Sequence, residues 1–372
     1  TGGLRLKNET KILLHIVREK RIRRKDLEAI ISVTPSTMTY LLDKLKNFID
    51  IEEEVPTLGK PPQFLSISKN AWKILAVSVG REKIRAVLYN AKGEELESFE
   101  HRVKKEDLSN DGINNVLQQS IDKFYDYDSI GIAFSGTIHD EIVDSKILSL
   151  RDYDPVRSLR LKSLGVPYII ISDVEAIAAY ESKKTGKDKV FVLNYGTGIG
   201  ACYYEYHALF SRDEFKNIPF GHMYAGGNEQ CYCGNVGCLE TVASDYVIVK
   251  KFYDKNLNFI DFINREEEYW KILKVVRNLH KTDEANAREL YKEVIEHLAM
   301  TLGNTSVLLG INEITLYGEG ASKWLAEQLE EKINSLAKNF SISVKYGNTL
   351  DAVERGVSLE AAINLIKKKI TK

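Results

Sequence analysis

The chain has 372 residues, of which 44% are hydrophobic and 28% charged, and its formal net charge is −1. This length and composition indicate an ordinary globular protein with two or three domains. No apolar run is long enough to span a membrane and no signal peptide opens the chain, so we expect a cytoplasmic protein with no membrane partner. The four cysteines, three of them clustered, argue against a disulfide-stabilised secreted protein.

The first seventy residues combine an excess of positive charge with a pattern of three short helices. They contain 13 Lys and Arg against 9 Asp and Glu, whereas the rest of the chain is net negative. Apolar periodicity predicts helices over residues 8–18 and 24–31, joined by a basic turn at residues 21–24. Thr34 is suited to cap a third helix that begins at Pro35 and reaches about Phe48. Helices at this spacing are typical of a helix-turn-helix.

The exposed face of the third helix is the candidate DNA-binding surface. Small hydroxyl side chains near a helix N-terminus allow close approach to phosphates and base edges in the major groove. The alternative is a plain three-helix scaffold with a solvated polar face. Residues 49–55 and 64–68 then predict two strands around a basic Gly/Pro-rich tip, which favours a wing. We therefore expect a winged helix-turn-helix that binds double-stranded operator DNA through Ser36, Thr37, Thr39, Tyr40, Lys44 and, in the wing, Lys60.

The remaining three hundred residues alternate between predicted strands and helices, with glycine turns at strand ends. This order predicts an α/β fold that binds ligands at those turns. The turn at Gly196, Thr197, Gly198 and Gly200 exposes backbone N–H groups that can cradle a phosphate or sugar oxygen, unless it is only a tight turn. Asp173 lies at a strand-to-helix junction, where it could cap the helix or act as a general base on a hydroxyl.

Three cysteines follow a histidine closely enough to form one metal site. Cys231 comes nine residues after His222, and Cys233 and Cys238 follow within the next seven residues. One imidazole and three thiolates are a complete tetrahedral set for zinc, with no position left for water. Buried thiols, or a disulfide with one free thiol, are the alternative. We expect one structural Zn²⁺ per chain that fixes the direction of the nearby Glu240, while Cys202 is a core thiol.

Together these segments resemble the ROK family of repressors and sugar kinases over nearly the whole chain. The resemblance rests on Gly221-His222 with the cysteine cluster through Glu240, the glycine turn at 196–200, Ser172-Asp173 and the wing sequence at 59–62. It implies a two-lobed actin-like ATPase fold of the sugar-kinase type, a sugar bound between the lobes, and a homodimer or homotetramer. The expected domains are a winged helix-turn-helix at 1–70, an N-terminal α/β lobe at 71–184 and a C-terminal α/β lobe with the zinc site at 185–372. The effector-binding residues that the resemblance implies are Ser172, Asp173, Gly136, His222 and Glu240.

Departures from the family pattern distinguish the repressors from the kinases. ROK kinases have Asp-x-Gly-x-Thr where this chain has Ser78-Val79-Gly80-Arg81-Glu82, so the carboxylate and the threonine that serve the nucleotide are both absent. The adenosine turn reads Gly318-Glu319-Gly320, with a charge inserted. Pro219 stands where the family has a sugar-binding glutamate, and Glu175 stands where it has an asparagine. These departures predict a protein without kinase activity and with an altered sugar site.

Three functions remain open on these observations. We favour a transcriptional repressor of carbohydrate-utilisation genes whose operator binding is controlled by a sugar, sugar phosphate or polyol. The first alternative is an ATP-dependent sugar kinase with Asp173 as its catalytic base. The second is a large domain that serves assembly and binds no ligand, which Pro219 would permit.

Overall fold

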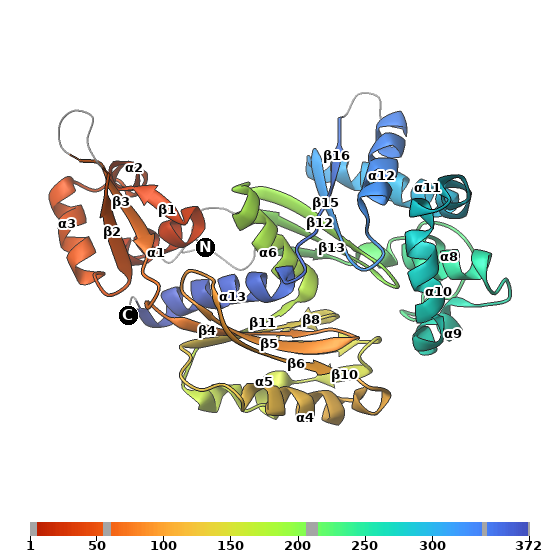
Figure 1. The fold of residues 1–372 in the computed structure, drawn as a ribbon, viewed down its shortest axis with the longest axis horizontal. Coiled ribbons are helices and arrows are strands. Elements are labelled where there is room, and N and C mark those ends of the chain that lie inside the picture. The colour runs from red at the N-terminus through yellow and green to blue at the C-terminus, as the bar shows by residue number, and fades with distance from the viewer. Residues whose placement is uncertain (1–5, 55–60, 206–214, 337–340, 371–372) are drawn as a thin grey trace. The chain divides into compact units, whose positions relative to one another are not determined.

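The computed structural model describes residues 6–54, 61–205, 215–336 and 341–370 (Figure 1). They form two compact units, each considered by itself below. Of the described residues, unit 1 contains those from 6 to 188 and from 351 to 370, and unit 2 contains 189–205 and those from 215 to 350. Residues 351–370 thus group with the first unit, whereas the expected domain division assigned them to the C-terminal lobe.

Unit 1 begins with a winged helix-turn-helix. Its elements are α1 (Asn8–Glu19), β1 (Arg21–Arg23), α2 (Arg24–Ile31), α3 (Pro35–Lys44), β2 (Ile49–Glu53) and β3 (Gln63–Ile67). The three strands form an antiparallel sheet in the order β1-β3-β2. Met38, Leu41 and Leu42 of α3 are buried, as is Leu45 just after it. The helix-turn-helix and its wing strands therefore agree with the sequence prediction.

Two local predictions in this domain were wrong. The expected basic turn at residues 21–24 contains the short strand β1, because Ile22 is buried while the flanking arginines stay exposed, and all three residues pair with β3. The guanidinium of Arg21 also lies 3.7 Å from the centre of the Phe64 ring. The third helix ends at Lys44 and not near Phe48, because the chain turns there to enter β2.

The rest of unit 1 is a sheet with helices on both faces. The sheet order is β11-β7-β4-β5-β6, where β7 is parallel to β4 and β11, and the other pairs are antiparallel. Figure 1 shows α6 and α13 on one face and α4 and α5 on the other. The strands are β4 (Lys73–Val79), β5 (Lys83–Asn90), β6 (Glu95–Arg102), β7 (Ser129–Phe134) and β11 (Tyr168–Ser172), and the helices are α4 (Asn110–Ile121), α5 (Pro155–Ser158), α6 (Asp173–Thr185) and α13 (Ala352–Leu365). A small second sheet contains β8 (Thr137–His139), β9 (Ile142–Ser145) and β10 (Leu150–Tyr153).

One hydrophobic core joins the winged helix to the sheet of unit 1. Ile12 and Ile16 of α1, Trp72 before β4, and Leu365 of α13 belong to the same buried cluster. Alternate residues of β4 face this cluster, while Leu75, Val77 and Val79 face the α4 side. Because burial of apolar area is the main stabilising force in folding, this shared core holds the first helix against the ROK-like part of the unit.

Unit 2 contains a second five-stranded sheet in the order β14-β13-β12-β15-β16. Its strands are β12 (Lys189–Tyr195), β13 (Ile199–Glu205), β14 (Phe215–Ile218), β15 (Glu313–Tyr317) and β16 (Ser343–Tyr346), and its helices are α7 (Leu239–Ala243), α8 (Asp245–Phe252), α9 (Phe259–Asn264), α10 (Glu266–Asn278), α11 (Glu284–Leu309) and α12 (Lys323–Leu336). One core cluster packs strands and helices together and includes Cys231 and Cys238. Two of the four metal candidates are therefore anchored in the core of this unit.

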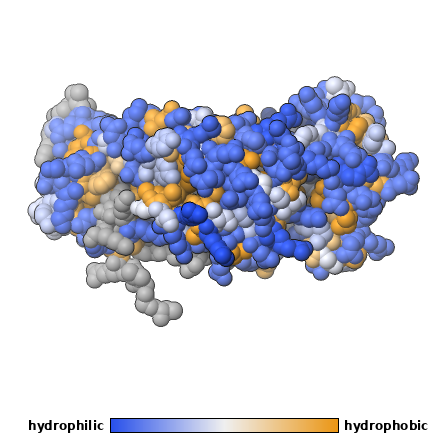
Figure 2. All heavy atoms as spheres, turned by 90° about the horizontal axis from the view of Figure 1, so that it is seen from below, coloured by the Kyte–Doolittle hydropathy of each residue, from blue (hydrophilic) through white to orange (hydrophobic). Residues whose placement is uncertain are grey.

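On the face in Figure 2, hydrophilic side chains predominate and apolar ones lie among them in small groups. Among the described residues, no helix combines the length and the apolarity that a membrane crossing requires.

Candidate metal centre and effector-binding residues

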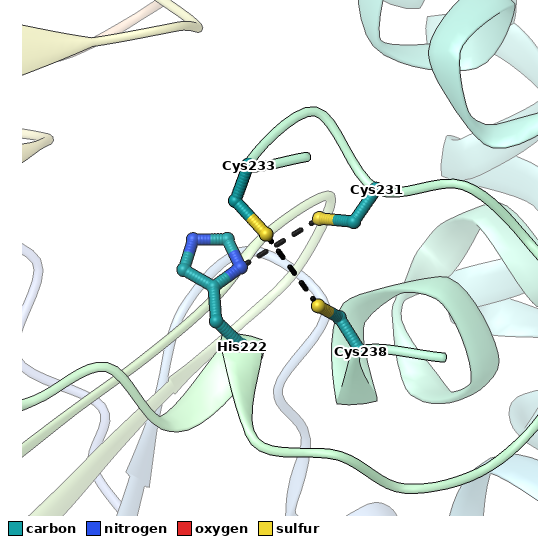
Figure 3. A group of neighbouring side chains, drawn as sticks. All are labelled: His222, Cys231, Cys233 and Cys238. Atoms are coloured by element: carbon teal, nitrogen blue, oxygen red, sulfur yellow. Dashed lines mark hydrogen bonds between the residues drawn. The ribbon is translucent and has the colours of Figure 1, made fainter. Parts of the chain in front are cut away.

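His222, Cys231, Cys233 and Cys238 converge in unit 2, as the sequence predicted. Figure 3 shows their side chains pointing toward one another. Their ligand atoms all lie within 4.8 Å of one another. The Nδ1 atom of His222 is 3.6 Å from Cys231 Sγ, and the Sγ atoms of Cys233 and Cys238 are also 3.6 Å apart. Tetrahedral zinc with its usual bond lengths would hold two sulfurs about 3.8 Å apart, and a sulfur and a nitrogen about 3.5 Å apart. The four residues therefore fit a zinc ion.

The loop that carries the cysteines is shaped by short backbone contacts. The Cys231 N–H donates to the Asn235 carbonyl at 2.8 Å, and Gly234 and Gly237 have φ angles of 94° and 77°. Only glycine adopts such angles without strain. Burial raises the pKa of the Cys238 thiol to about 11 in the metal-free chain. A bound divalent cation reverses this preference, because it binds the deprotonated thiolate.

Glu240 lies two residues after the last cysteine, and its carboxylate is held by the backbone. Its side chain is buried, and Oε1 accepts a hydrogen bond from the Ile199 N–H at 2.8 Å. Oε2 is also buried, but it has no hydrogen-bonding partner among the described residues. Burial raises the pKa of Glu240, and the nearby Tyr232 hydroxyl has a smaller effect in the opposite direction. The Tyr232 hydroxyl nevertheless forms no hydrogen bond with Oε2. A buried carboxylate oxygen without a donor can accept a hydrogen bond from a ligand hydroxyl.

The glycine before the metal-binding histidine makes room for this carboxylate. A Cβ atom at Gly221 would lie 2.6 Å from Glu240 Cγ and 2.4 Å from the Ile199 carbonyl oxygen. Gly221 belongs to a short 3₁₀ helix over residues 220–222 that also positions His222. His222 and the Glu240 carboxylate are thus positioned by the same packed segment. The Ile199 N–H contributes to this arrangement, and the sequence did not reveal its role.

Asp173 lies in unit 1 at the first position of α6. The cap of this helix is Ser172, whose Oγ accepts from the Glu175 N–H at 3.3 Å, while Glu175 Oε2 accepts from the Ser172 N–H at 2.7 Å. This reciprocal capping box leaves Asp173 free of the capping role. Its Oδ2 accepts from Ser135 Oγ at 2.7 Å, and burial raises the pKa of this carboxyl. Gly136 follows Ser135 at the end of β7, on the same unit as Asp173.

The glycine turn at 196–200 joins β12 to β13 in unit 2, next to a buried ion pair. The Gly196 N–H donates to the Gly198 carbonyl at 3.0 Å, which closes the turn. Arg277 contacts Asp245 Oδ2 at 2.7 Å and Glu319 at 3.1 Å. A Cβ at Gly196 would lie within 4 Å of both Arg277 and Asp245. Carboxylates therefore lie beside the turn that would have to cradle a phosphate.

Ser78, the first residue of the segment that replaces the kinases' first nucleotide motif, contacts a carboxylate, and the sequence did not reveal this contact. Ser78 Oγ donates to Glu354 Oε1 at 2.8 Å, although the two residues are 276 positions apart. Glu354 is buried on α13, and a guanidinium nitrogen of Arg85 lies 3.8 Å from the same oxygen. Position 78 thus lacks the family's aspartate and contacts a carboxylate from another segment.

The proposed DNA contacts on α3 are exposed. Ser36, Thr37, Thr39, Tyr40 and Lys44 all face solvent, and Lys44 Nζ lies 4.6 Å from the centre of the Tyr40 ring. Thr34 caps the helix as expected, since its Oγ1 accepts from the Thr37 N–H at 3.2 Å. Lys60 lies outside the described residues.

Arg24 is a positioning residue of this surface that the sequence analysis missed. Its guanidinium donates to Thr39 Oγ1 at 2.7 Å and to the Pro35 carbonyl at 2.9 Å, both in α3. It also donates to Gln63 Oε1 at 3.0 Å, on the wing strand β3. The Arg24 side chain therefore links α3, the candidate DNA-recognition helix, to the wing strand β3.

The comparisons with known proteins agree with these observations. The ROK family model matches residues 74–355. The chain is 27% identical over 276 residues to the xylose repressor of Bacillus subtilis (strain 168), covering 69% of this chain and 71% of the relative. It is 24% identical over 249 residues to the DNA-binding transcriptional repressor Mlc of Escherichia coli (strain K12), covering 60% and 59%.

Two solved structures have a similar fold. One is described as a ROK family transcriptional regulator, homologous to E. coli MLC, with a TM-score of 0.72, 18% identity and coverage of 97% of this chain and 98% of that one. The ROK hexokinase from Thermus thermophilus has a TM-score of 0.58, 17% identity and coverage of 78% and 98%. The expected fold, a winged helix before a ROK domain, is confirmed, and the family match spans well over half of the sequence. The chain belongs to the ROK family.

Proposed function

We propose that this protein is a DNA-binding transcriptional repressor of carbohydrate-utilisation genes. The observation that carries the proposal is the winged helix-turn-helix before the ROK domain, with five polar residues of α3 exposed. Its homologues include a xylose repressor and the repressor Mlc. As a homodimer or homotetramer, it would place two α3 helices on successive major grooves of a palindromic operator.

A sugar, sugar phosphate or polyol is the proposed effector. The buried Oε2 of Glu240 has no partner among the described residues and would accept a ligand hydroxyl. The proposed effector-binding residues of unit 2 are His222 and Glu240, and those of unit 1 are Ser172, Asp173 and Gly136. Zinc held by His222 and the three cysteines would fix the Glu240 segment without taking part in any reaction. Effector binding alters operator affinity only if it favours one state of the protein over the other.

A gel-shift experiment at low salt tests the DNA-binding part of this proposal. Genomic fragments are titrated with the full chain and with Tyr40→Ala, which removes a side chain that is 60% exposed on α3. Tyr125→Ala is the matched control, since Tyr125 is 80% exposed beyond the end of α4. We expect the wild type and the control to retain a fragment and Tyr40→Ala to bind it at least several-fold more weakly. A wild type that retains no fragment would end the proposal.

Sugar phosphotransfer is the second candidate function, because the partly buried Asp173 contacts Ser135 and has a raised pKa as a general base requires. The carboxylates of Glu354 at the first nucleotide motif and of Glu319 at the adenosine turn argue against it. A triphosphate placed near them would be repelled unless a metal ion intervened. Turnover of ATP with a hexose that disappears in Asp173→Asn would reverse this ranking.

A further inference from the structure

A small cavity lies within unit 1 where the winged helix meets the ROK domain. Its volume is about 200 Å³. The end of α1, the segment before β4, the turn between β5 and β6, the last turn of α6 and one side of α13 all contribute to its wall. Five basic side chains line it, and no acidic one does: Lys20, Lys92, Lys183, Lys184 and Arg355.

Two of these cations have no counter-charge in the described part of the chain. Lys92 pairs with Asp50 at 3.3 Å and Arg355 with Asp351 at 2.7 Å. The side-chain ammonium groups of Lys20 and Lys183 form no hydrogen bond or ion pair with any residue that the structure describes. Burial, together with the nearby charge of Lys20, lowers the pKa of Lys183 to about 8. Lys20 is exposed and Lys183 is partly buried. Two ammonium groups without counter-charges at one cavity repel each other, and an anion bound between them would relieve this repulsion.

The cavity also offers an unused hydrogen-bond donor and aromatic walls. Tyr89 lines it and is 1% exposed, and its hydroxyl is a buried polar atom without a partner among the described residues. Burial is the main cause that raises the pKa of this hydroxyl, so it stays protonated and can donate. Trp72 and Tyr180 form part of the wall. Buried polar atoms are nearly always satisfied in native proteins, so a cavity wall that carries both an unsatisfied donor and two unpaired cations points to a missing acceptor.

We propose that this junction cavity binds the phosphate group of a small phosphorylated metabolite, at a site separate from the sugar site. Lys20 and Lys183 would contact the phosphate oxygens and the Tyr89 hydroxyl would donate to one of them. A phosphate monoester carries close to two negative charges, which matches two unpaired lysines better than a single carboxylate does. The cavity has room for about seven water molecules, enough for a phosphate and a short attached group.

The position of the cavity gives such a ligand a means to act on the DNA-binding domain. Lys20 follows the last residue of α1, the first helix of the winged domain, whereas Lys183 is in the last turn of α6, which begins at Asp173. A bound phosphate would bridge the two helices and reduce the freedom of α1 against the ROK domain. Its binding free energy would then be linked to the conformation that binds DNA. This last step rests on the proposed repressor function, whereas phosphate binding itself does not.

The experiment measures anion binding to the full chain by calorimetry. Inorganic phosphate, glucose 6-phosphate and glucose are titrated into the wild type, Lys183→Met, Lys20→Met and the control Lys162→Met, which changes an exposed lysine of the same unit. We expect glucose 6-phosphate or inorganic phosphate to bind the wild type and the control equally, and at least tenfold more weakly to either cavity variant. Lys183→Met removes an unpaired, partly buried charge, so it should fold, as circular dichroism will verify.

Two results would overturn the proposal. One is the absence of binding by either phosphate compound to the wild type at millimolar concentration. The other is equal affinity in the wild type and Lys183→Met, which would locate the phosphate elsewhere, including the sugar site. Stronger binding of glucose 6-phosphate than of inorganic phosphate would identify a phosphorylated metabolite, and equal binding would identify the free anion as sufficient. The titrations contain no DNA, so they test phosphate binding even if the proposed repressor function is wrong.

Discussion

The two oxygens of Glu240 allow a structural role to be separated from a ligand-binding role. Oε1 accepts from the Ile199 N–H at 2.8 Å, whereas Oε2 has no partner in the described residues. Glu240→Gln keeps an oxygen for Ile199 and replaces the free one with an amide nitrogen. Glu240→Ala removes both, and leaves a buried N–H without an acceptor.

The expected magnitudes follow from these contacts. A buried donor that loses its acceptor costs about 1–3 kcal/mol, so Glu240→Ala should destabilise unit 2 by that amount. Glu240→Gln should change stability by less than about 1 kcal/mol, because the Ile199 bond persists and a buried charge is removed. Both variants should bind a sugar effector at least tenfold more weakly, since the amide cannot accept a hydroxyl proton at the Oε2 position.

Urea unfolding followed by tryptophan fluorescence measures stability, and thermal shifts with xylose, glucose and sorbitol measure ligand binding. Saturation at a hundred times the dissociation constant would stabilise the wild type by about 2.7 kcal/mol, a readily measured amount. Glu229→Gln is the matched control, because Glu229 is also held by a backbone N–H, that of Phe259 at 3.2 Å, and by Lys250. The reasoning fails if Glu240→Gln responds to the sugars as the wild type does, or if Glu240→Ala is as stable as the wild type.

Three other changes test separate parts of the structure. Cys233→Ser should lower zinc from one atom per chain, measured by mass spectrometry of the metal, and abolish the effector response while residues 1–70 stay folded; unchanged zinc content would contradict the assigned ligands. Lys183 has its pKa lowered from 10.5 to about 8, so its charge destabilises the fold below pH 8 and this penalty fades as the pH rises toward 10.5. Lys183→Met should therefore be more stable than the wild type at pH 7 by about 1–3 kcal/mol, a figure reduced for solvent screening of this partly exposed side chain, and urea unfolding at pH 7 and 10 should show the difference shrinking. Ser78→Asp should place a second carboxylate beside Glu354, lower the melting temperature more at pH 8 than at pH 4, and confer no ATP turnover; restored turnover would show that residue 78 alone disables the nucleotide site.

The features that the sequence predicted best are those set by near neighbours in the chain. The helix α2 has the predicted bounds, and the predicted metal ligands converge because all four lie within seventeen residues. The strand β1 was missed because three residues form a strand only through pairing with β3, more than forty positions later. Local propensity carries little information about such a partner. The contact of Arg24 with α3 and the wing was missed for the same reason.

The departures from the kinase pattern also differ in whether the residues that explain them are near or distant in the sequence. Ser172 and Glu175 form a capping box three residues apart, so the sequence already contained the signal that explains both substitutions together. The serine at position 78 is explained only by its contact with Glu354, which lies 276 positions later in the sequence. With an aspartate at position 78, its carboxylate and that of the buried Glu354 would repel each other, whereas a serine hydroxyl donates a hydrogen bond to Glu354. The serine at position 78, where the sequence resemblance implies an aspartate in the kinases, therefore forms a stabilising contact with Glu354.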